Sequence, residues 1–173
     1  MPRIVRFHQT GGPDVLNIVE EPLVPPKEGE VRLRVHALGL NRAEAMFRSG
    51  AYLEVAQLPS RLGYEAAGVV DAIGPGVSGV KIGDRVSTIP AFGLSAHGVY
   101  GESAVVPAIA VAPYPEHFTP EQGSAVWMQY MTAWIGLLER GQLQKGQTVL
   151  ITAASSSVGL AAIQIAKATG ATT

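Results

Sequence analysis

The chain has 173 residues, of which 47% are hydrophobic and 16% charged, with a formal net charge of −1 and a mean hydropathy of +0.21. This balance is typical of a globular protein and gives no electrostatic reason to expect binding to nucleic acid or to an anionic membrane. The absence of cysteine excludes disulfides, thiolate nucleophiles and sulfur-ligated zinc within these residues. No apolar run approaches the length of a membrane span and the N-terminus lacks the apolar core of a secretory signal, so we expect a cytoplasmic protein.

The first 120 residues are divided into short apolar runs by Gly, Pro and Asp, at intervals of about ten residues, as in a β-barrel. The clearest strand is 30–38, where Val31, Leu33, Val35 and Ala37 alternate with polar side chains, so that one face is apolar. A short helix is expected over 41–50, closed by a glycine. Other strands are expected within 3–8, 15–21, 66–74, 83–89, 100–107 and 108–113.

The pattern changes near residue 120. Thr119-Pro120-Glu121-Gln122 has the features of a helix N-terminus, with a capping box between Thr119 and Gln122. Apolar residues at helical spacing predict a helix over 128–140, which Gly141 could end in a left-handed conformation. A buried strand is expected at 145–152 and a helix at 158–169. We therefore predict an all-β domain at 1–120 and the beginning of an α/β domain at 121–173.

The most specific stretch is "GYEAAGVVDAIGPGVSGVKIGDRV", residues 63–86. It resembles the signature of the medium-chain dehydrogenase/reductase superfamily, which includes zinc alcohol dehydrogenases and quinone oxidoreductases. The positions that fit its spacing are Gly63, Glu65, Gly68 and Gly74, followed by the usual turn and strand at 83–86. The resemblance implies a GroES-like barrel followed by an α/β Rossmann domain. These glycines indicate the fold and say little about the chemistry.

Two departures from that signature concern the metal. The zinc-ligand histidine of the zinc members is Tyr64 here, and their first ligand cysteine is Asn41. A zinc alcohol dehydrogenase needs a Lewis acid to stabilise an alkoxide. We therefore expect no zinc, and the resemblance points to the zinc-free branch of the superfamily.

The stretch "GLNRAEAMFRSGAY", residues 39–52, resembles that zinc-free branch. The resemblance implies that Asn41 and Tyr52 face the nicotinamide and the substrate, and that Tyr52 stands where related enoyl-thioester reductases have a proposed proton donor. A phenol can donate a proton or only a hydrogen bond. The alternative is that Tyr52 is an aromatic side chain that packs at the end of a loop.

The stretch "GQTVLITAASSSVGLAAIQIAK", residues 146–167, resembles the quinone oxidoreductase signature. Only the last glycine of a Gly-x-Gly-x-x-Gly fingerprint survives, at Gly159. Serine keeps the backbone amides that hold a phosphate at a helix N-terminus, although a serine run before a helix can also be only an N-cap. The resemblance implies that the cofactor contacts Ser155, Ser156, Ser157, Val158 and Gly159, together with Thr132 in "YMTAW".

The resemblance implies a zinc-independent, NADPH-dependent oxidoreductase that transfers hydride to a quinone or an α,β-unsaturated carbonyl. An enoyl-thioester reductase and a non-enzymatic NADPH-binding or structural relative remain alternatives. Members of the family are about twice this length, and the residue that selects NAD or NADP would fall beyond Thr173. We therefore expect an inactive fragment of a longer enzyme, and a homodimer in which the apolar segment near the C-terminus packs on another copy.

Overall fold

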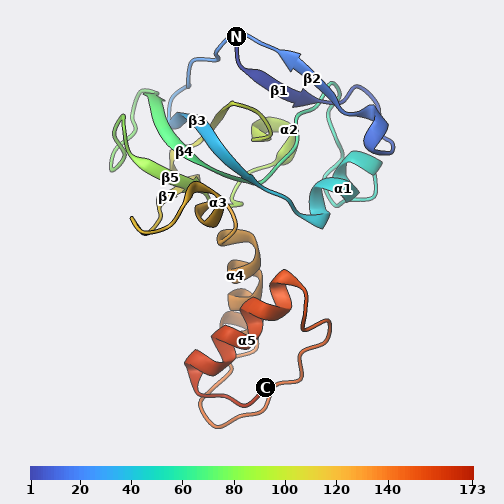
Figure 1. Ribbon diagram of the computed structural model, residues 1–173, viewed down its shortest axis with the longest axis vertical. Helices are drawn as coiled ribbons and strands as arrows, with labels where there is room; N and C mark the ends of the chain where they lie inside the picture. The colour runs from blue at the N-terminus through green and yellow to red at the C-terminus, as the bar shows by residue number, and fades with distance from the viewer. The chain divides into compact units, whose positions relative to one another are not determined.

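The computed structural model describes all residues from Met1 to Thr173, and the chain divides into two compact units, Met1–Ala125 and Val126–Thr173. Each unit is described by itself. The first consists of two antiparallel sheets with short helices, and the second is helical (Figure 1).

The first unit begins with a two-stranded sheet of β1 (Arg3–Arg6) and β2 (Asn17–Glu20), linked through the 3₁₀ turn η1 (Pro13–Val15). The second sheet has the strand order β6-β3-β4-β5-β7, and every neighbouring pair is antiparallel. Its strands are β3 (Glu30–Gly39), β4 (Glu65–Ile73), β5 (Arg85–Thr88), β6 (Ser103–Pro107) and β7 (Val111–Pro113). The strands expected from the sequence therefore form in the first unit, except that residues 108–110 of the strand expected at 108–113 form a 3₁₀ turn. The mainly β character expected for this unit is confirmed.

Three short helices and a second 3₁₀ turn complete this unit: α1 (Arg42–Ser49), α2 (Leu94–His97), α3 (Pro120–Gly123) and η2 (Ala108–Ala110). Gly50 ends α1 in the left-handed conformation, with φ of 79°. The capping box expected at α3 is present, because Gln122 N donates to Thr119 Oγ1 at 3.3 Å and Thr119 N donates to Gln122 Oε1 at 2.9 Å.

The alternation predicted for 30–38 is seen in β3, where Val31 and Leu33 are fully buried and the arginine between them is not. The buried residues of this unit also include Phe7 and Phe47, whose rings meet edge to face with centroids 5.8 Å apart. Burying each such side chain stabilises the fold by about 1.5–3 kcal/mol. The ring contact joins α1 to the segment that follows β1.

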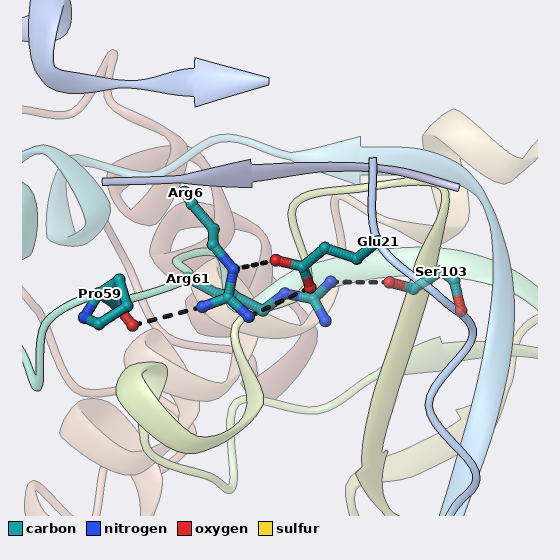
Figure 2. Close-up of polar contacts among 5 residues, drawn as sticks. All are labelled: Arg6, Glu21, Pro59, Arg61 and Ser103. Atoms are coloured by element: carbon teal, nitrogen blue, oxygen red, sulfur yellow. Dashed lines mark hydrogen bonds and ion pairs between the residues drawn. The ribbon is translucent and has the colours of Figure 1, made fainter. Parts of the chain in front are cut away.

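A polar cluster ties distant segments of the first unit together (Figure 2). Arg6 on β1 forms an ion pair with Glu21 and donates to the carbonyl oxygen of Pro59 at 3.3 Å. Arg61 donates to the carbonyl oxygen of Ser103, on β6, at 2.7 Å, and burial lowers the pKa of its guanidinium to about 10. These contacts hold the segment that leads into β4.

The second unit consists of α4 (Trp127–Trp134), a π-helical turn η3 (Ile135–Arg140) and α5 (Ser157–Thr169). Helices α4 and α5 pack side by side (Figure 1). Tyr130 Oη donates to Gln164 Oε1 at 2.6 Å across this contact. The buried residues between the helices are Ala133, Ala161, Ala162 and Ile165. Small side chains thus let the two helices approach closely.

The expected left-handed end at Gly141 is wrong. Gly141 is right-handed, with φ of −80°, and Gln142 takes the positive φ of 48°. A Cβ on Gly141 would lie 2.8 Å from the carbonyl oxygens of Gly136 and Leu137. The glycine is needed there because of this close backbone approach and not because of its own dihedral angles.

The strand expected at 145–152 is also not seen as a buried strand. Its one ladder contact is an isolated parallel bridge between Thr148 and Thr172, with Val149 N donating to Thr172 O at 2.9 Å. Leu150 is 90% exposed. A central parallel strand needs a partner on each edge and a cover on each face, and the chain supplies this segment with one short partner, near Thr172.

Candidate functional site

Asn41 lies directly after β3 and caps the N-terminus of α1. Its backbone N–H donates to Glu44 Oε2 at 2.7 Å, and its side-chain Nδ2 donates to Glu65 Oε2 at 2.9 Å. The register of the sheet explains the second contact, because Gly39 at the end of β3 pairs with Glu65 at the start of β4. The fold therefore fixes both the backbone and the amide of Asn41.

Glu44 and Glu65 are both buried, each with only 3% of its surface exposed. Glu44 also accepts a hydrogen bond from the backbone N–H of Tyr64 at 3.1 Å, so it joins the start of α1 to the segment that enters β4. Burial raises the pKa of Glu44 above its ordinary value, and hydrogen bonds from Tyr64 and Asn41 oppose that shift. Asn41 thus stands beside two carboxyl groups that water does not reach.

Tyr64 connects this cluster to Tyr52. Burial is the main reason that the pKa of Tyr64 is raised, and the neighbouring Tyr52 side chain adds to the shift. The ring of Tyr52 meets the edge of Phe47 with centroids 6.5 Å apart. Thr88 Oγ1 donates to the carbonyl oxygen of Tyr64 at 2.7 Å, which fixes the backbone of Tyr64. Tyr52 therefore packs against the core, with its phenol next to Tyr64.

Two glycines make these close approaches possible. A Cβ on Gly39 would lie 2.7 Å from Glu65 Oε2 and 2.4 Å from the carbonyl oxygen of Ser124. Gly63 has a φ of +104°, and its Cβ would lie 2.1 Å from the ring of Tyr100. Tyr100 Oη donates to the carbonyl oxygen of Gly39 at 3.2 Å. The family glycine at 63 thus makes room for an aromatic ring that holds the end of β3.

The serine-rich candidates lie in the second unit, at the N-terminus of α5. Ser156 is the N-cap, and its Oγ accepts from the backbone N–H of Gly159 at 3.0 Å. A Cβ on Gly159 would lie 2.5 Å from the carbonyl oxygen of Ala153, so this glycine allows the turn to fold tightly onto the helix. Ser155, Ser156 and Ser157 are exposed. The turn therefore presents the first turn of a thirteen-residue helix to solvent.

Thr132 also lies in the second unit, on α4. Its side chain is exposed, and its Oγ1 donates to the carbonyl oxygen of Met128 at 2.6 Å. This local bond leaves the acceptor lone pairs of the hydroxyl available. No contact within the second unit explains a threonine at this position.

Glu44 was not among the residues predicted for the site, although Asn followed three residues later by Glu is the pattern of a capping box. Tyr64 was predicted only as the residue at the zinc-ligand position. In the structure Glu44 joins Asn41 to Tyr64, and Tyr64 neighbours Tyr52.

The side chains at the two metal positions are Asn41 and Tyr64, and the chain holds no group of three or more His, Cys, Asp or Glu side chains arranged for a metal ion. No helix is long and apolar enough to cross a membrane.

Residues 27–116, just over half of the chain, match the family described as the alcohol dehydrogenase GroES-like domain. The chain belongs to this family. Human quinone oxidoreductase is 40% identical over 169 residues, which is 97% of this chain and 50% of that protein. The chain thus spans about half the length of the curated relatives that it matches.

Solved structures of the superfamily agree with this assignment. Escherichia coli quinone oxidoreductase complexed with NADPH has a TM-score of 0.83 at 35% identity, over 98% of this chain and 50% of that chain. The enoyl reductase CurK has a TM-score of 0.86 at 26% identity, over 98% of this chain and 52% of that chain. The chain is therefore a quinone oxidoreductase-like member of the medium-chain dehydrogenase/reductase superfamily.

Proposed function

We propose that this chain is part of a longer, zinc-independent oxidoreductase that uses NADPH to reduce a quinone or an α,β-unsaturated carbonyl. The observation that carries the proposal is that Asn41 and Tyr64 stand where the zinc members of the superfamily hold their metal, with the amide of Asn41 bonded to Glu65 and the backbone of Tyr64 bonded to Glu44. The similarity to quinone oxidoreductases, one of them complexed with NADPH, supports the substrate and cofactor.

In this proposal the bound nicotinamide supplies a hydride to the electrophilic carbon of the substrate. The protein's own contribution is the proton: Tyr52 donates it from Oη to the resulting oxyanion or enolate. We propose that Tyr64, whose side chain neighbours Tyr52, helps to position the Tyr52 phenol. Since a buried phenol resists ionisation, Tyr64 remains protonated and acts as a fixed partner.

The N-terminus of α5 supports a phosphate contact. The backbone N–H groups of Ser157 and Val158, in the first turn, have no acceptor within the chain, as is usual at a helix N-terminus. Such amides together with the helix dipole favour an anion. We propose that they hold the cofactor phosphates, with the hydroxyls of Ser155, Ser156 and Ser157 beside them and Thr132 contacting the cofactor from α4.

The absence of zinc follows from chemistry at the two metal positions, since an amide and a phenol replace a thiolate and an imidazole. Elemental analysis of the purified protein checks this part of the proposal. We expect less than stoichiometric zinc; one zinc per chain would show that other ligands bind it and would remove the proton-donor mechanism.

Turnover tests the proposed reaction directly. We expect the longer protein to oxidise NADPH with a simple naphthoquinone. A preference for crotonyl-CoA would favour an enoyl-thioester reductase instead, which the similarity to the enoyl reductase CurK supports. Binding of NADPH with no turnover of quinone or enone would favour a non-enzymatic relative.

We propose residues 1–120 as the catalytic GroES-like domain and 121–173 as the beginning of the nucleotide-binding domain. The 173-residue chain alone should be inactive, because a helix N-terminus contributes only about 0.3–1 kcal/mol, whereas micromolar binding requires about 8 kcal/mol. Titration with NADPH should show no saturation below about 1 mM. Micromolar binding would contradict this.

We also propose a cytoplasmic homodimer. The exposed segment around Leu150 has one short backbone partner in its own chain, so it can pair with a second copy. Helix α5 already packs on α4, so the segment and not the helix would carry the contact. Light scattering after size exclusion should give a dimer for the 173-residue chain and a monomer when it is cut near Gly141.

A further inference from the structure

The N–H donors of the Asn41 side-chain amide are directed at carboxyl groups inside the protein. Nδ2 donates to Glu65 Oε2 at 2.9 Å and approaches Glu44 Oε1 at 3.5 Å. The side-chain oxygen accepts no hydrogen bond that caps α1, because the backbone N–H of Glu44 donates to the backbone carbonyl oxygen of Asn41 at 3.3 Å. An amide has two N–H donors and an oxygen with two lone pairs. The positions that are left are therefore acceptor lone pairs on Oδ1.

The two carboxyl groups determine which end of the amide faces inward. If the amide were rotated by half a turn, Oδ1 would face oxygen atoms of Glu44 and Glu65. Each of these two residues is only 3% exposed. Buried acceptors without a donor are costly. The orientation is thus set by charge as well as by packing. Asn41 itself is only half-buried, so a ligand can reach it.

We propose that Glu44 and Glu65 are positioning residues that make Asn41 a hydrogen-bond acceptor toward the bound ligand. Given the proposed function, Asn41 receives a hydrogen bond from a donor on the ligand, a hydroxyl or an amide N–H, and does not polarise the substrate carbonyl. The donor to the carbonyl oxygen is Tyr52. The site thus divides its two roles between two residues, and Asn41 contributes to binding the cofactor and not to the chemical step.

The positioning can be tested in the 173-residue chain without any assay of function. The chain has two asparagines. The other one, Asn17, donates from its Nδ2 to the carbonyl oxygen of Val15 at 3.0 Å and serves as an internal reference. In side-chain amide NMR we expect Glu65→Gln, which leaves an uncharged and weaker acceptor, to accelerate proton exchange of the Asn41 amide by roughly threefold or more. The Asn17 amide should not change.

Glu54→Gln is the matched control, because Glu54 accepts from the backbone N–H groups of Leu94 and Ser95 at 2.9 Å and does not touch Asn41. It should leave the exchange of both asparagine amides unchanged. Equal exchange of the Asn41 amide in wild type and Glu65→Gln, with the chain folded, would overturn the positioning role. Should Glu65→Gln fail to fold, the same comparison with Glu44→Gln decides.

The acceptor role is tested by kinetics of the longer enzyme. Asn41→Ala should raise the KM for NADPH by roughly tenfold and leave the kcat for quinone within a factor of about two. If Asn41 instead donated to the developing oxyanion, kcat should fall by roughly 10²–10³-fold with little change in that KM. The second pattern would overturn the acceptor role even where the NMR result holds. Absence of all turnover in the wild type would contradict the proposed function and leave the NMR result standing.

Discussion

The two candidate regions hold their polar groups in opposite ways. Around Asn41, two buried carboxyl groups form hydrogen bonds that join the start of α1 to the start of β4 in the first unit. At the serine turn of the second unit, the hydroxyls are exposed, and one side-chain bond, from Gly159 N to Ser156 Oγ, caps the helix. The first region is organised before any ligand arrives. The serine turn offers backbone N–H groups whose arrangement depends on one capping hydrogen bond, that of Ser156.

This difference fits the two kinds of contact that the proposed reaction needs. A proton donor must stand within hydrogen-bonding reach of one atom, so its neighbours must be fixed. A phosphate carries several equivalent oxygens, and backbone amides at a helix end can hold it without a precise side chain. Fixing Asn41 has a cost in stability, because a carboxyl group must be buried to hold it. The raised pKa of Glu44 reflects this cost, since burial disfavours its ionised form.

The largest effect should come from removing the Tyr52 hydroxyl. In the longer enzyme, Tyr52→Phe should lower kcat by roughly 10²-fold or more, because a general acid contributes about that factor. The ring still packs on Phe47, so the variant should fold. Steady-state kinetics with NADPH and a quinone, across pH, measure the effect.

Tyr64→Phe is the matched control, since it removes the neighbouring phenol and leaves that of Tyr52. It should reduce kcat less than Tyr52→Phe, because Tyr64 acts only by positioning. Unchanged kcat in Tyr52→Phe at every pH would remove Tyr52 from the mechanism and leave solvent as the source of the proton. The ordered region around Asn41 and Tyr52 would then have only a structural role.

A glycine substitution compares the packing of the two units. In Gly39→Ala the new Cβ would meet the carbonyl oxygen of Ser124 at 2.4 Å and the carboxylate of Glu65 at 2.7 Å. We expect a loss of about 1–3 kcal/mol, the usual cost of overpacking. In Gly136→Ala nothing lies within 4 Å of the Cβ, so the helical second unit should gain up to about 1 kcal/mol.

Denaturant unfolding of the two variants separates these effects. Both tryptophans, Trp127 and Trp134, belong to the second unit, so their fluorescence reports on that unit. Near-UV circular dichroism adds the tyrosines of the first unit. An equal effect of the two substitutions would show that the end of β3 is no more tightly constrained than an exposed helix turn.

The sequence predicted the first unit better than the second for a physical reason. Alternating apolar residues such as Val31 and Leu33 determine which face of a strand is buried, and their partners lie within the same unit. The apolar segment around Leu150 was expected to be buried, yet burial of a parallel strand depends on neighbours on both sides. Local pattern alone could not supply those neighbours, and the segment is exposed.

The candidate site was predicted only in part. The positions of Asn41 and Tyr52 came from resemblance. The hydrogen bond between Asn41 and Glu65, which are 24 residues apart, depends instead on the pairing of β3 with β4. Glu44 could have been found from the capping-box spacing. That its carboxyl group also reaches the backbone of Tyr64 is a tertiary contact, which no spacing rule gives.

The cost of burying Glu44 should be visible in the pH dependence of stability. Because the folded state raises the pKa of this carboxyl group above 4.5, its contribution is most favourable below pH 4.5. Stability is then lost as the pH rises through the raised pKa, since the buried group must ionise. Glu44→Gln should lack this loss, so the stability of the wild type relative to the variant should fall with rising pH.

Glu21→Gln provides a control of the opposite sign. Hydrogen bonding to Arg6 lowers the pKa of Glu21, so this ion pair stabilises the fold above pH 4.5 and is lost as the pH falls through the lowered pKa. Urea unfolding between pH 3 and 8 measures both variants. Parallel pH profiles for wild type and Glu44→Gln would show that the carboxyl group is not held in a dry environment.

The smallest effect should come from the serine turn. Ser156→Ala removes the oxygen that accepts from Gly159 N at 3.0 Å, and loss of an N-cap costs about 1 kcal/mol. Ser155→Ala should be nearly silent, because the Ser155 hydroxyl makes no contact that caps α5. Tryptophan fluorescence during denaturant unfolding measures the stability of both variants, because both tryptophans lie in the second unit.

If the two variants lost equal stability, the turn would be held by several groups, and the contrast with the region around Asn41 would disappear. If only Ser156→Ala loses stability, the other two serines remain available for a ligand, and their substitution in the longer enzyme should weaken NADPH binding without affecting folding.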